Sequence, residues 1–297
     1  MFSALISLGM LGATIRISTP LILAAIGAAL SLKANLFNTA IEGFMLIGAF
    51  LAVLLSTKLE NPYVALLITV LMTGLLGVLY GFVTITLGSD HIIAGLGFNL
   101  FATGITTWIL QSVLNSPGGF MDPSIKNLPV VNIELINNIP ILNVIFNDQD
   151  LITYSAWIVF AIAYLFVHQS KFGLRLRATG EYQLAASTLG IKTIFWKYFA
   201  ALWTGIMAGL AGASISLSHL QMFSQGMTAG RGFIAFAAAT FANGNILGTT
   251  VMALLFGFFG SVAIRLEGYG LPTQFVQMIP YLMTLLALIF TRRNTKK

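Results

Sequence analysis

Two charged side chains lie inside apolar stretches of the sequence. Glu42 stands in AIEGFMLIGAF, and Arg231 stands in TAGRGFIA. A charge within the hydrocarbon of a membrane is costly, so such residues usually mark a functional pathway. We expect both side chains to line a polar path, where they could pair directly. The alternative is that Glu42 lies in the headgroup layer and that Arg231 extends its long side chain to water from the end of a half helix.

Further polar and aromatic side chains could recognise a polar solute that carries a flat ring. Asn38, Asn99 and Asn243 could hydrogen-bond such a solute, and Phe98 and Phe233 could stack on its ring. The amides could equally satisfy one another between helices, and most of the 23 phenylalanines are expected to face lipid or the protein core. Together with Glu42 and Arg231, these are the residues we expect along a substrate path.

Catalytic and metal chemistry have no matching pattern in this sequence. The chain has no cysteine, and its histidines lie at predicted span ends without metal-ligand spacing. No Ser/His/Asp set or pair of carboxylates is predicted at a common depth. We therefore expect no catalytic residue, no metal and no cofactor bound by this chain.

The composition is that of a membrane protein. Hydrophobic residues make up 57% of the chain and charged residues only 8%, whereas a soluble domain is about a quarter charged. Segments 61–88, 91–111, 151–167, 198–230, 232–264 and 268–291 contain no Lys, Arg, Asp or Glu. Because about 20 apolar residues cross a bilayer, we predict an all-α polytopic protein of about 8–10 membrane segments. It forms one transmembrane domain over residues 1–297.

The apolar runs also predict where the chain crosses. Complete crossings are expected at 39–56, 63–87, 92–114, 151–167, 198–218, 246–264 and 273–290. The N-terminal 32 residues are either one long kinked helix through Pro20 or an interfacial segment followed by a crossing from Ile17. Segment 226–243 has roughly a dozen apolar residues after Arg231, which is too short to span and typical of a re-entrant half helix. Glycines at 77, 81, 205, 209 and 212 predict close approach of helix backbones.

A basic island interrupts this apolar chain at about residues 169–197. Within it, residues 181–190 are predicted to form one short exposed helix that starts at Glu181 and ends at Gly190. The positive-inside rule places the island and the basic tail in the cytoplasm, and the acidic loop at about 115–150 outside. The net charge of +6 therefore reflects topology and does not indicate a nucleic-acid partner. Successive spans alternate in direction, so the island and the tail lie on the same side only if segment 226–243 also reaches the side of the island.

Three stretches resemble the bacterial ABC transporter permeases that serve simple sugars and nucleosides. Residues 40–50 resemble that family's LEGMMLIGAF region, and residues 226–235 resemble the EGMTAGRGFIALAA stretch of the shorter permease in nucleoside importers. Gly180 and Glu181, with Ala185, Ala186 and Gly190, are similar to its cytoplasmic coupling loop. The resemblance extends over roughly residues 17–290. Gln225 stands where the family often has Glu.

The resemblance implies a function and a set of partners. The chain would be the permease of an ATP-driven importer in the bacterial plasma membrane, with a cytoplasmic C-terminus, and would form the translocation path for a nucleoside. It would pair with a second, longer permease, and the coupling loop would contact an ATP-binding subunit. The loop at about 115–150 would face an extracytoplasmic substrate-binding lipoprotein. ATP would be used by the partner ATPase, and this chain would be no enzyme.

Two other interpretations of the function remain open. The same path could carry a simple sugar such as a pentose. Alternatively, an ion-gradient-driven secondary transporter could use Glu42 as its intramembrane acid, but the exposed helix on the basic side would then be unexplained.

Overall fold

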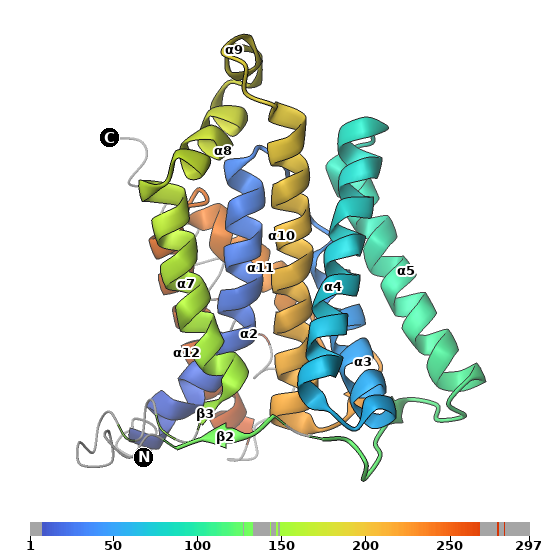
Figure 1. Cartoon of the computed structure of the whole chain (residues 1–297). Coiled ribbons are helices and arrows are strands. Elements are labelled where there is room, and N and C mark those ends of the chain that lie inside the picture. Colours follow the sequence, from blue (N-terminus) through green and yellow to red (C-terminus); the bar gives the residue numbers. More distant parts are fainter. Residues whose placement is uncertain are drawn as a thin grey trace.

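The computed structural model describes residues 8–126, 128–132 and 149–267, together with positions 143, 147, 278 and 282. In these ranges, seven helices are long and apolar enough to cross a membrane, and one shorter apolar helix accompanies them. The prediction of an all-α, polytopic membrane protein is confirmed (Figure 1). The predicted last crossing at 273–290 and the basic tail fall outside the described residues.

The long helices follow the predicted crossings closely. They are α2 (Leu8–Lys33), α3 (Ile41–Leu59), α4 (Pro62–Gly81), α5 (His91–Ser112), α7 (Leu151–Gln169), α10 (Thr193–Ala213) and α12 (Ile246–Glu267). Helix α4 continues into the π-helical turn Phe82–Thr86, and α10 continues into the π-helical segment Ser214–Leu220. From Leu8 onward, the N-terminal segment is a single helix, because α2 continues through Arg16 and Pro20 without a break before Ile17.

Helices α2 and α10 form the centre of the bundle. In the apolar windows of these two spans, 83% and 78% of the residues are buried. Side-chain hydroxyls join the two helices, since Thr204 donates to the Gly27 carbonyl at 2.8 Å and contacts the Ser31 hydroxyl at 2.5 Å. Each hydroxyl thereby finds a partner inside the bundle, where an unsatisfied polar group would be costly.

Small residues let α10 approach α4, as the glycine spacing predicts. A Cβ atom on Gly77 would collide with the carbonyl oxygen of Ala201, and a Cβ atom on Gly205 would collide with that of Thr73. The two backbones are therefore in direct contact, which is the geometry that small-xxx-small patterns allow in membranes.

Helix α5 lies at the edge of the molecule (Figure 1). Only 17% of its apolar window is buried. Asp90 caps its N-terminus, with its carboxylate accepting from the N–H groups of Ile92 and Ile93 at 2.8 and 3.0 Å. These two hydrogen bonds hold the pKa of Asp90 below its ordinary value, because they stabilise the charged form.

Two short strand pairs lie at one end of the bundle. Strand β1 (Gly119–Phe120) pairs antiparallel with β4 (Phe223–Ser224), and β2 (Val130–Val131) pairs with β3 (Gln149–Asp150). The first pair joins the loop after α5 to the segment that leads into α11 (Arg231–Phe241). Helices α8 and α9 lie at the opposite end (Figure 1).

Candidate functional site

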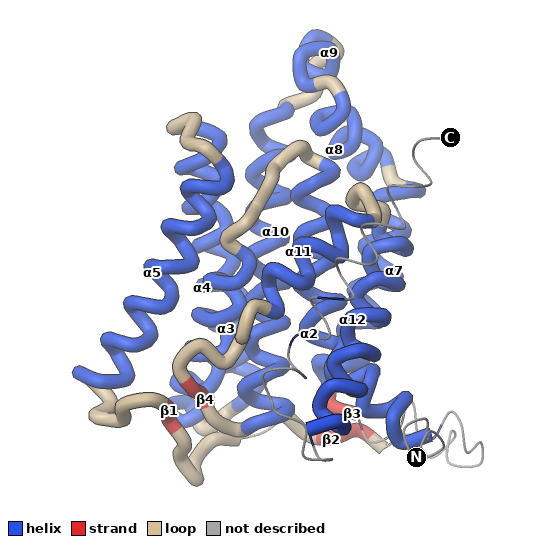
Figure 2. The backbone as a smooth tube through the Cα atoms, turned by 180° about the vertical axis from the view of Figure 1, so that it is seen from behind, coloured by secondary structure: helices blue, strands red, loops and turns tan. Residues whose placement is uncertain are grey.

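Two non-helical segments enter the bundle from opposite ends and meet inside it. One is the segment 34–40 between α2 and α3, and the other is the segment 225–230 between β4 and α11. Figure 2 shows both as loop segments that reach the middle of the bundle before a helix begins. The N-termini of α3 and α11 therefore face the same interior region, which we call the broken-helix junction.

The Glu42 carboxylate holds this junction together. Its Oε1 accepts hydrogen bonds from the Thr228 hydroxyl at 2.6 Å and from the Gly230 N–H at 2.8 Å. Its Oε2 accepts from the Gly232 N–H at 2.6 Å. Glu42 belongs to the first turn of α3, so one helix supplies the anion that caps the N-terminus of the other.

The unpaired N–H groups at the start of α11 explain why a carboxylate lies there. The first N–H groups of a helix have no partner within it, and the helix dipole makes that end partly positive. Inside a membrane bundle these groups need an acceptor from elsewhere in the protein or from a ligand. Gly232 makes the approach possible, because a Cβ atom there would lie 2.6 Å from both the Cα and the N of Glu42.

Asn99 of α5 performs the same task for the start of α3. Its Oδ1 accepts from the Gly43 N–H at 2.8 Å, and its Nδ2 donates to the Thr39 carbonyl at 3.0 Å. A side chain from a third helix thus bridges the break between the segment 34–40 and α3. Both breaks are closed by side chains distant in sequence.

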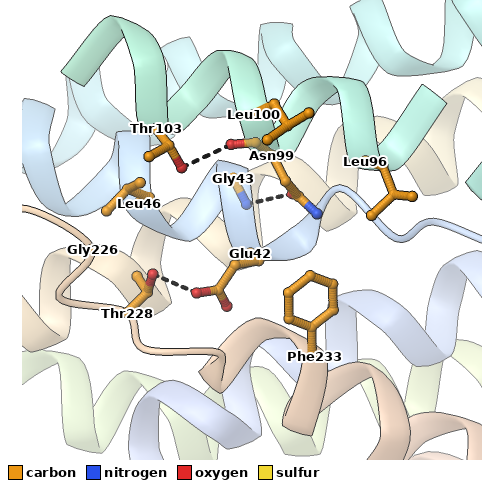
Figure 3. A pocket seen from close by; sticks show the side chains of 10 residues that line it. All are labelled: Glu42, Gly43, Leu46, Leu96, Asn99, Leu100, Thr103, Gly226, Thr228 and Phe233. Atoms are coloured by element: carbon orange, nitrogen blue, oxygen red, sulfur yellow. Dashed lines mark hydrogen bonds between the residues drawn. The ribbon is translucent and has the colours of Figure 1, made fainter. Parts of the chain in front are cut away.

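A cavity of about 360 Å³ opens beside the junction. Figure 3 shows Glu42, Asn99 and Phe233 around it. The remaining lining residues are Gly43, Leu46, Leu96, Leu100, Thr103, Gly226 and Thr228. A cavity of this size lies within the range of small-molecule sites, about 300–1,000 Å³. Its mixture of apolar walls and a few convergent polar groups is typical of such sites.

The other predicted path residues lie elsewhere. Arg231 lines a separate cavity of about 300 Å³ together with Ile17 and Glu267, and its Nη1 donates to the Met227 carbonyl at 2.9 Å. The two charges that the sequence suggested as a pair thus line different cavities. Asn243 is exposed just beyond the end of α11.

Asn38 and Phe98 pack inside the protein near the first break. Asn38 is fully buried, and its Oδ1 accepts from the Ala40 N–H at 3.0 Å. Its Nδ2 has no hydrogen-bond partner among the described residues. Phe98 packs edge-on against Phe44 and Tyr80, with ring centroids 5.9 and 5.8 Å away.

Sequence reasoning missed two hydroxyls of the cavity, Thr103 and Thr228. Thr228 lies inside the GMTAGRGF stretch that resembles the permease family, and this resemblance is the signal that could have identified it. Thr103 carries no local signal, because only the packing of α5 against α3 brings it to the cavity. In the described part of the chain, no group of three or more His, Asp, Glu or Cys could hold a metal ion.

The basic island forms two helices where one was predicted. Helix α8 (Lys171–Glu181) ends at Glu181, and the short helix α9 (Gln183–Thr188) begins after Tyr182. The prediction that Glu181 starts the short helix is therefore wrong. Lys197 of α10 donates to the Gln183 side chain at 2.7 Å and so fixes the first turn of α9. Gly180 lies against the backbone of Lys33 and Asn35, which ties the end of α8 to the loop after α2.

The end of the short helix is as predicted. Gly190 has a φ of +80°, and its N–H donates to the Ser187 carbonyl while the Ile191 N–H donates to the Ala186 carbonyl. This is the glycine-terminated geometry in which the last carbonyls are satisfied. Ala186 is buried, whereas Ala185 is exposed.

Helix α9 presents apolar side chains outward. Tyr182, Leu184 and Leu189 are 76%, 81% and 80% exposed. Figure 1 shows α9 beyond the ends of the long helices. The same end holds the far end of α11, because the backbone of Gly244 lies near Ala29 and Lys33. This confirms that the half helix reaches the side of the basic island.

Comparison with known proteins gives consistent matches over most of the chain. A family model described as "Branched-chain amino acid transport system / permease component" matches residues 10–288. The chain is 33% identical to the nucleoside ABC transporter permease protein NupC of Lactococcus lactis subsp. cremoris (strain MG1363), covering 91% of this chain and 88% of NupC. It is 30% identical to the putative glucose ABC transporter permease protein TsgC13 of Haloferax volcanii, covering 89% and 79%. It is 29% identical to the guanosine ABC transporter permease protein NupQ of Bacillus subtilis (strain 168), covering 93% and 89%.

Each of the two nucleoside relatives has a counterpart that also matches. The same Lactococcus strain has NupB, 22% identical over 93% of this chain and 78% of NupB. The same Bacillus strain has NupP, 27% identical over 90% of this chain and 78% of NupP. These relatives therefore come as pairs of permeases. No solved structure gives a significant match.

Proposed function

Because the chain belongs to the ABC transporter permease family whose model is described as the permease component of branched-chain amino acid transport systems, we propose that it forms a translocation path for a nucleoside. As a member of this family it is a multi-pass membrane protein and a transport subunit, not an enzyme, and ATP is hydrolysed by a separate ATPase chain. The proposal concerns its substrate, its path and its individual contacts.

The broken-helix junction is the observation that carries the proposal. Interrupted helices that meet inside a bundle leave backbone groups and a cavity where a polar solute can bind. Here the cavity of about 360 Å³ combines the Glu42 carboxylate and the Thr103 hydroxyl with the Phe233 ring. Phe233 is 44% exposed, so a flat base can stack on it. The Glu42 carboxylate can accept hydrogen bonds from the hydroxyls of a ribose or the N–H groups of a base, and the threonine hydroxyls can accept from them as well.

The charge of the junction favours a neutral solute. A helix N-terminus is normally a good anion site. In this protein, Glu42 already occupies that position on α11 at 2.6–2.8 Å. A phosphorylated substrate would have to displace a bonded carboxylate, whereas a nucleoside or sugar would not.

The partner contacts are assigned by the same proposal. Within the coupling loop of Gly180, Glu181, Ala185, Ala186 and Gly190, the exposed residues Glu181, Ala185 and Gly190 form the contact with the ATP-binding subunit, supported by the exposed apolar side chains beside them. Gly180 and the buried Ala186 hold the loop against the bundle. The paired relatives support a second permease beside this chain. The loop at about 115–150 receives an extracytoplasmic substrate-binding lipoprotein. The chain lies in the bacterial plasma membrane with its C-terminus in the cytoplasm, and it binds no cofactor itself.

A sugar is the second candidate substrate. The support for it is the 30% identity to a putative glucose permease, nearly as high as the identity to the nucleoside permease NupC. The two candidates differ in what they need from the cavity, because only a nucleoside presents an aromatic base to Phe233.

Uptake competition tests the substrate. The complete importer is reconstituted in proteoliposomes, and uptake of labelled guanosine is measured with unlabelled adenosine, uridine, ribose or guanosine monophosphate as competitors. Nucleosides are expected to compete, and ribose and the monophosphate are not. If ribose displaces the nucleoside at similar concentrations, the nucleoside assignment is wrong.

Omission of the ATPase tests the energy source. Vesicles with both permeases but without the ATP-binding subunit are expected to show no concentrative uptake. Uptake that persists in such vesicles, driven by an ion gradient, would contradict the importer mechanism.

A further inference from the structure

A groove lies between the start of α8 and the start of α10, separate from the broken-helix junction. Its volume is about 550 Å³. Arg175 and Lys192 lie on its polar side, Phe172, Phe195 and Trp196 form its apolar side, and the turn after α9 closes one end. We call it the α8–α10 groove.

The aromatic side of the groove is preformed and open. Phe172 and Phe195 are 56% and 58% exposed, whereas Trp196 between them is nearly buried. Trp196 packs against Phe172 with ring centroids 6.0 Å apart and against Phe195 at 5.4 Å. Trp196 lies in the first turn of a spanning helix, a position near the headgroup layer where tryptophan is enriched in membrane proteins.

The cations on the other side have no counter-ion in the described structure. Arg175 and Lys192 are both exposed, and neither side chain has an ion pair or hydrogen bond to any described residue. By contrast, the nearby Lys197 is bonded to Gln183. Two such cations beside an apolar wall are complementary to a ligand with an anionic head and a hydrocarbon body.

A row of aromatic side chains leads from the groove along the bundle, because Trp196 packs against Phe199 with ring centroids 5.7 Å apart. Below Trp196, Phe199 of α10 lies 5.7 Å from Phe166 of α7, and Trp203 stacks on Phe199 at 6.0 Å. All three rings are only half-buried. Because α7 and α10 are membrane spans that end at the groove, the row leads from the headgroup level into the hydrocarbon. A soluble protein surface cannot follow this row, whereas an acyl chain can.

We propose that the α8–α10 groove binds an anionic phospholipid. Arg175 and Lys192 bind the phosphate, Phe172 and Phe195 flank the glycerol backbone, and one acyl chain lies along Phe199 and Trp203. Basic pockets between membrane helices are known to hold anionic headgroups in this way. The lipid would rest against the turn that ends α9, so its occupancy would brace the exposed short helix.

Tryptophan quenching tests the site directly. Trp196 is kept as the only tryptophan by replacing Trp108, Trp157 and Trp203 with Phe, and the permease pair is placed in phosphatidylcholine vesicles. Phosphatidylglycerol or phosphatidylcholine brominated near the glycerol end of its chains is then added in steps. Half-maximal quenching is expected at about a thirtyfold lower fraction of the anionic lipid, given two cations at the headgroup.

Matched charge variants show whether the two cations cause the preference. The double variant Arg175→Gln, Lys192→Gln is expected to abolish the preference for the anionic lipid. Its quenching by the zwitterionic lipid should stay unchanged, which also shows that the variant is folded. The double variant Arg175→Lys, Lys192→Arg keeps both charges and should keep the preference. Lys58→Gln with Lys126→Gln removes two cations from the opposite end and should also keep it. A preference that survives the first pair overturns the proposal.

Two further arms distinguish other occupants. Millimolar glycerol phosphate should leave the quenching unchanged, because it lacks the acyl chain; relief of quenching would mean a site for free phosphate. Addition of the ATP-binding subunit should likewise leave it unchanged. If that subunit removes the quenching, the groove is a protein contact and the lipid site does not exist.

Discussion

The broken-helix junction and helix α9 differ in whether their side chains find partners within this chain. At the junction, a half-buried carboxylate receives three hydrogen bonds at 2.6–2.8 Å from the start of another helix. On α9 and directly after it, Leu184 and Leu189 are about four-fifths exposed at the end of the molecule. One region satisfies its polar groups internally, and the other leaves apolar groups uncovered.

The difference separates internal structure from surfaces that await a partner. Buried polar groups are normally bonded, so the junction is a stable element of the fold that other motions must preserve or break as a unit. The exposed apolar side chains of Tyr182 and Leu184 lie beyond the ends of the spanning helices, where no lipid covers them, and mark a protein contact. Damage to the junction should therefore cost stability and transport together, whereas damage to the outward face of α9 should cost transport alone.

Removal of the Glu42 carboxylate has the largest expected effect. In Glu42→Ala, the Thr228 hydroxyl and two backbone N–H groups lose their acceptor. Each unsatisfied donor costs about 1–3 kcal/mol, so we expect the protein to lose about 3 kcal/mol or more of stability and essentially all uptake. Thermal unfolding in detergent and vesicle uptake measure both.

Glu60→Ala is the matched control for that change. Glu60 follows the other end of the same helix α3 and is exposed. It should leave both stability and uptake near those of the unmodified protein. Equal effects at the two positions would show that the cap at the junction has no special role.

A charge on the outward face of α9 should separate coupling from stability. In Ala185→Asp, an unpaired carboxylate enters the predicted contact with the ATP-binding subunit, which is expected to reduce uptake more than about tenfold. The melting temperature should stay unchanged, because Ala185 is exposed. Ala186→Asp places the same charge on the buried face and should destabilise the permease. Normal substrate-stimulated ATPase activity in Ala185→Asp would contradict the coupling role.

Loss of the Phe233 ring should weaken recognition of the base. Base–aromatic stacking contributes about 1–3 kcal/mol, so Phe233→Ala is expected to raise the concentration for half-maximal nucleoside uptake by about tenfold. Phe101→Ala is the control, since Phe101 is 55% exposed and lines a different, apolar cavity. If both variants shift uptake equally, Phe233 does not stack on the substrate.

The Thr103 hydroxyl should have the smallest effect. It already donates to the Asn99 carbonyl at 3.0 Å within α5. Thr103→Val keeps the side-chain shape, so uptake should change less than about threefold, the size of a modest hydrogen bond. A loss of tenfold or more would mean that this hydroxyl bonds the substrate directly, and it would move the centre of the site toward α5.

Much of the helical framework could be predicted from local sequence. The charge-free runs marked the spans because crossing a bilayer requires about 20 apolar residues. The short apolar run after Arg231 marked the half helix, and α11 is indeed only 11 residues long. The glycines of α4 and α10 marked a close contact, because only small residues permit it.

The break between α8 and α9 could not be read from the sequence. Gly180 is the one poor helix former in RLRATGEYQLAAST, and from Glu181 to Ser187 there is no glycine or proline, so nothing local separates Glu181 from Gln183. The structure places Gly180 against the backbone of Lys33 and bonds Gln183 to Lys197. Contacts to α2 and α10 therefore decide where one helix ends and the next begins.

The sequence by itself determined the class of protein, the spans that the structure describes and the half helix after Arg231, since these follow from the lengths of the apolar runs. Only the tertiary structure decided what Glu42 does. The sequence marked it as a costly charge, but its partners Thr228 and Gly232 lie 186 and 190 residues away along the chain. In a medium without water, a helix start must find its acceptor wherever the fold supplies one, and that choice is not local.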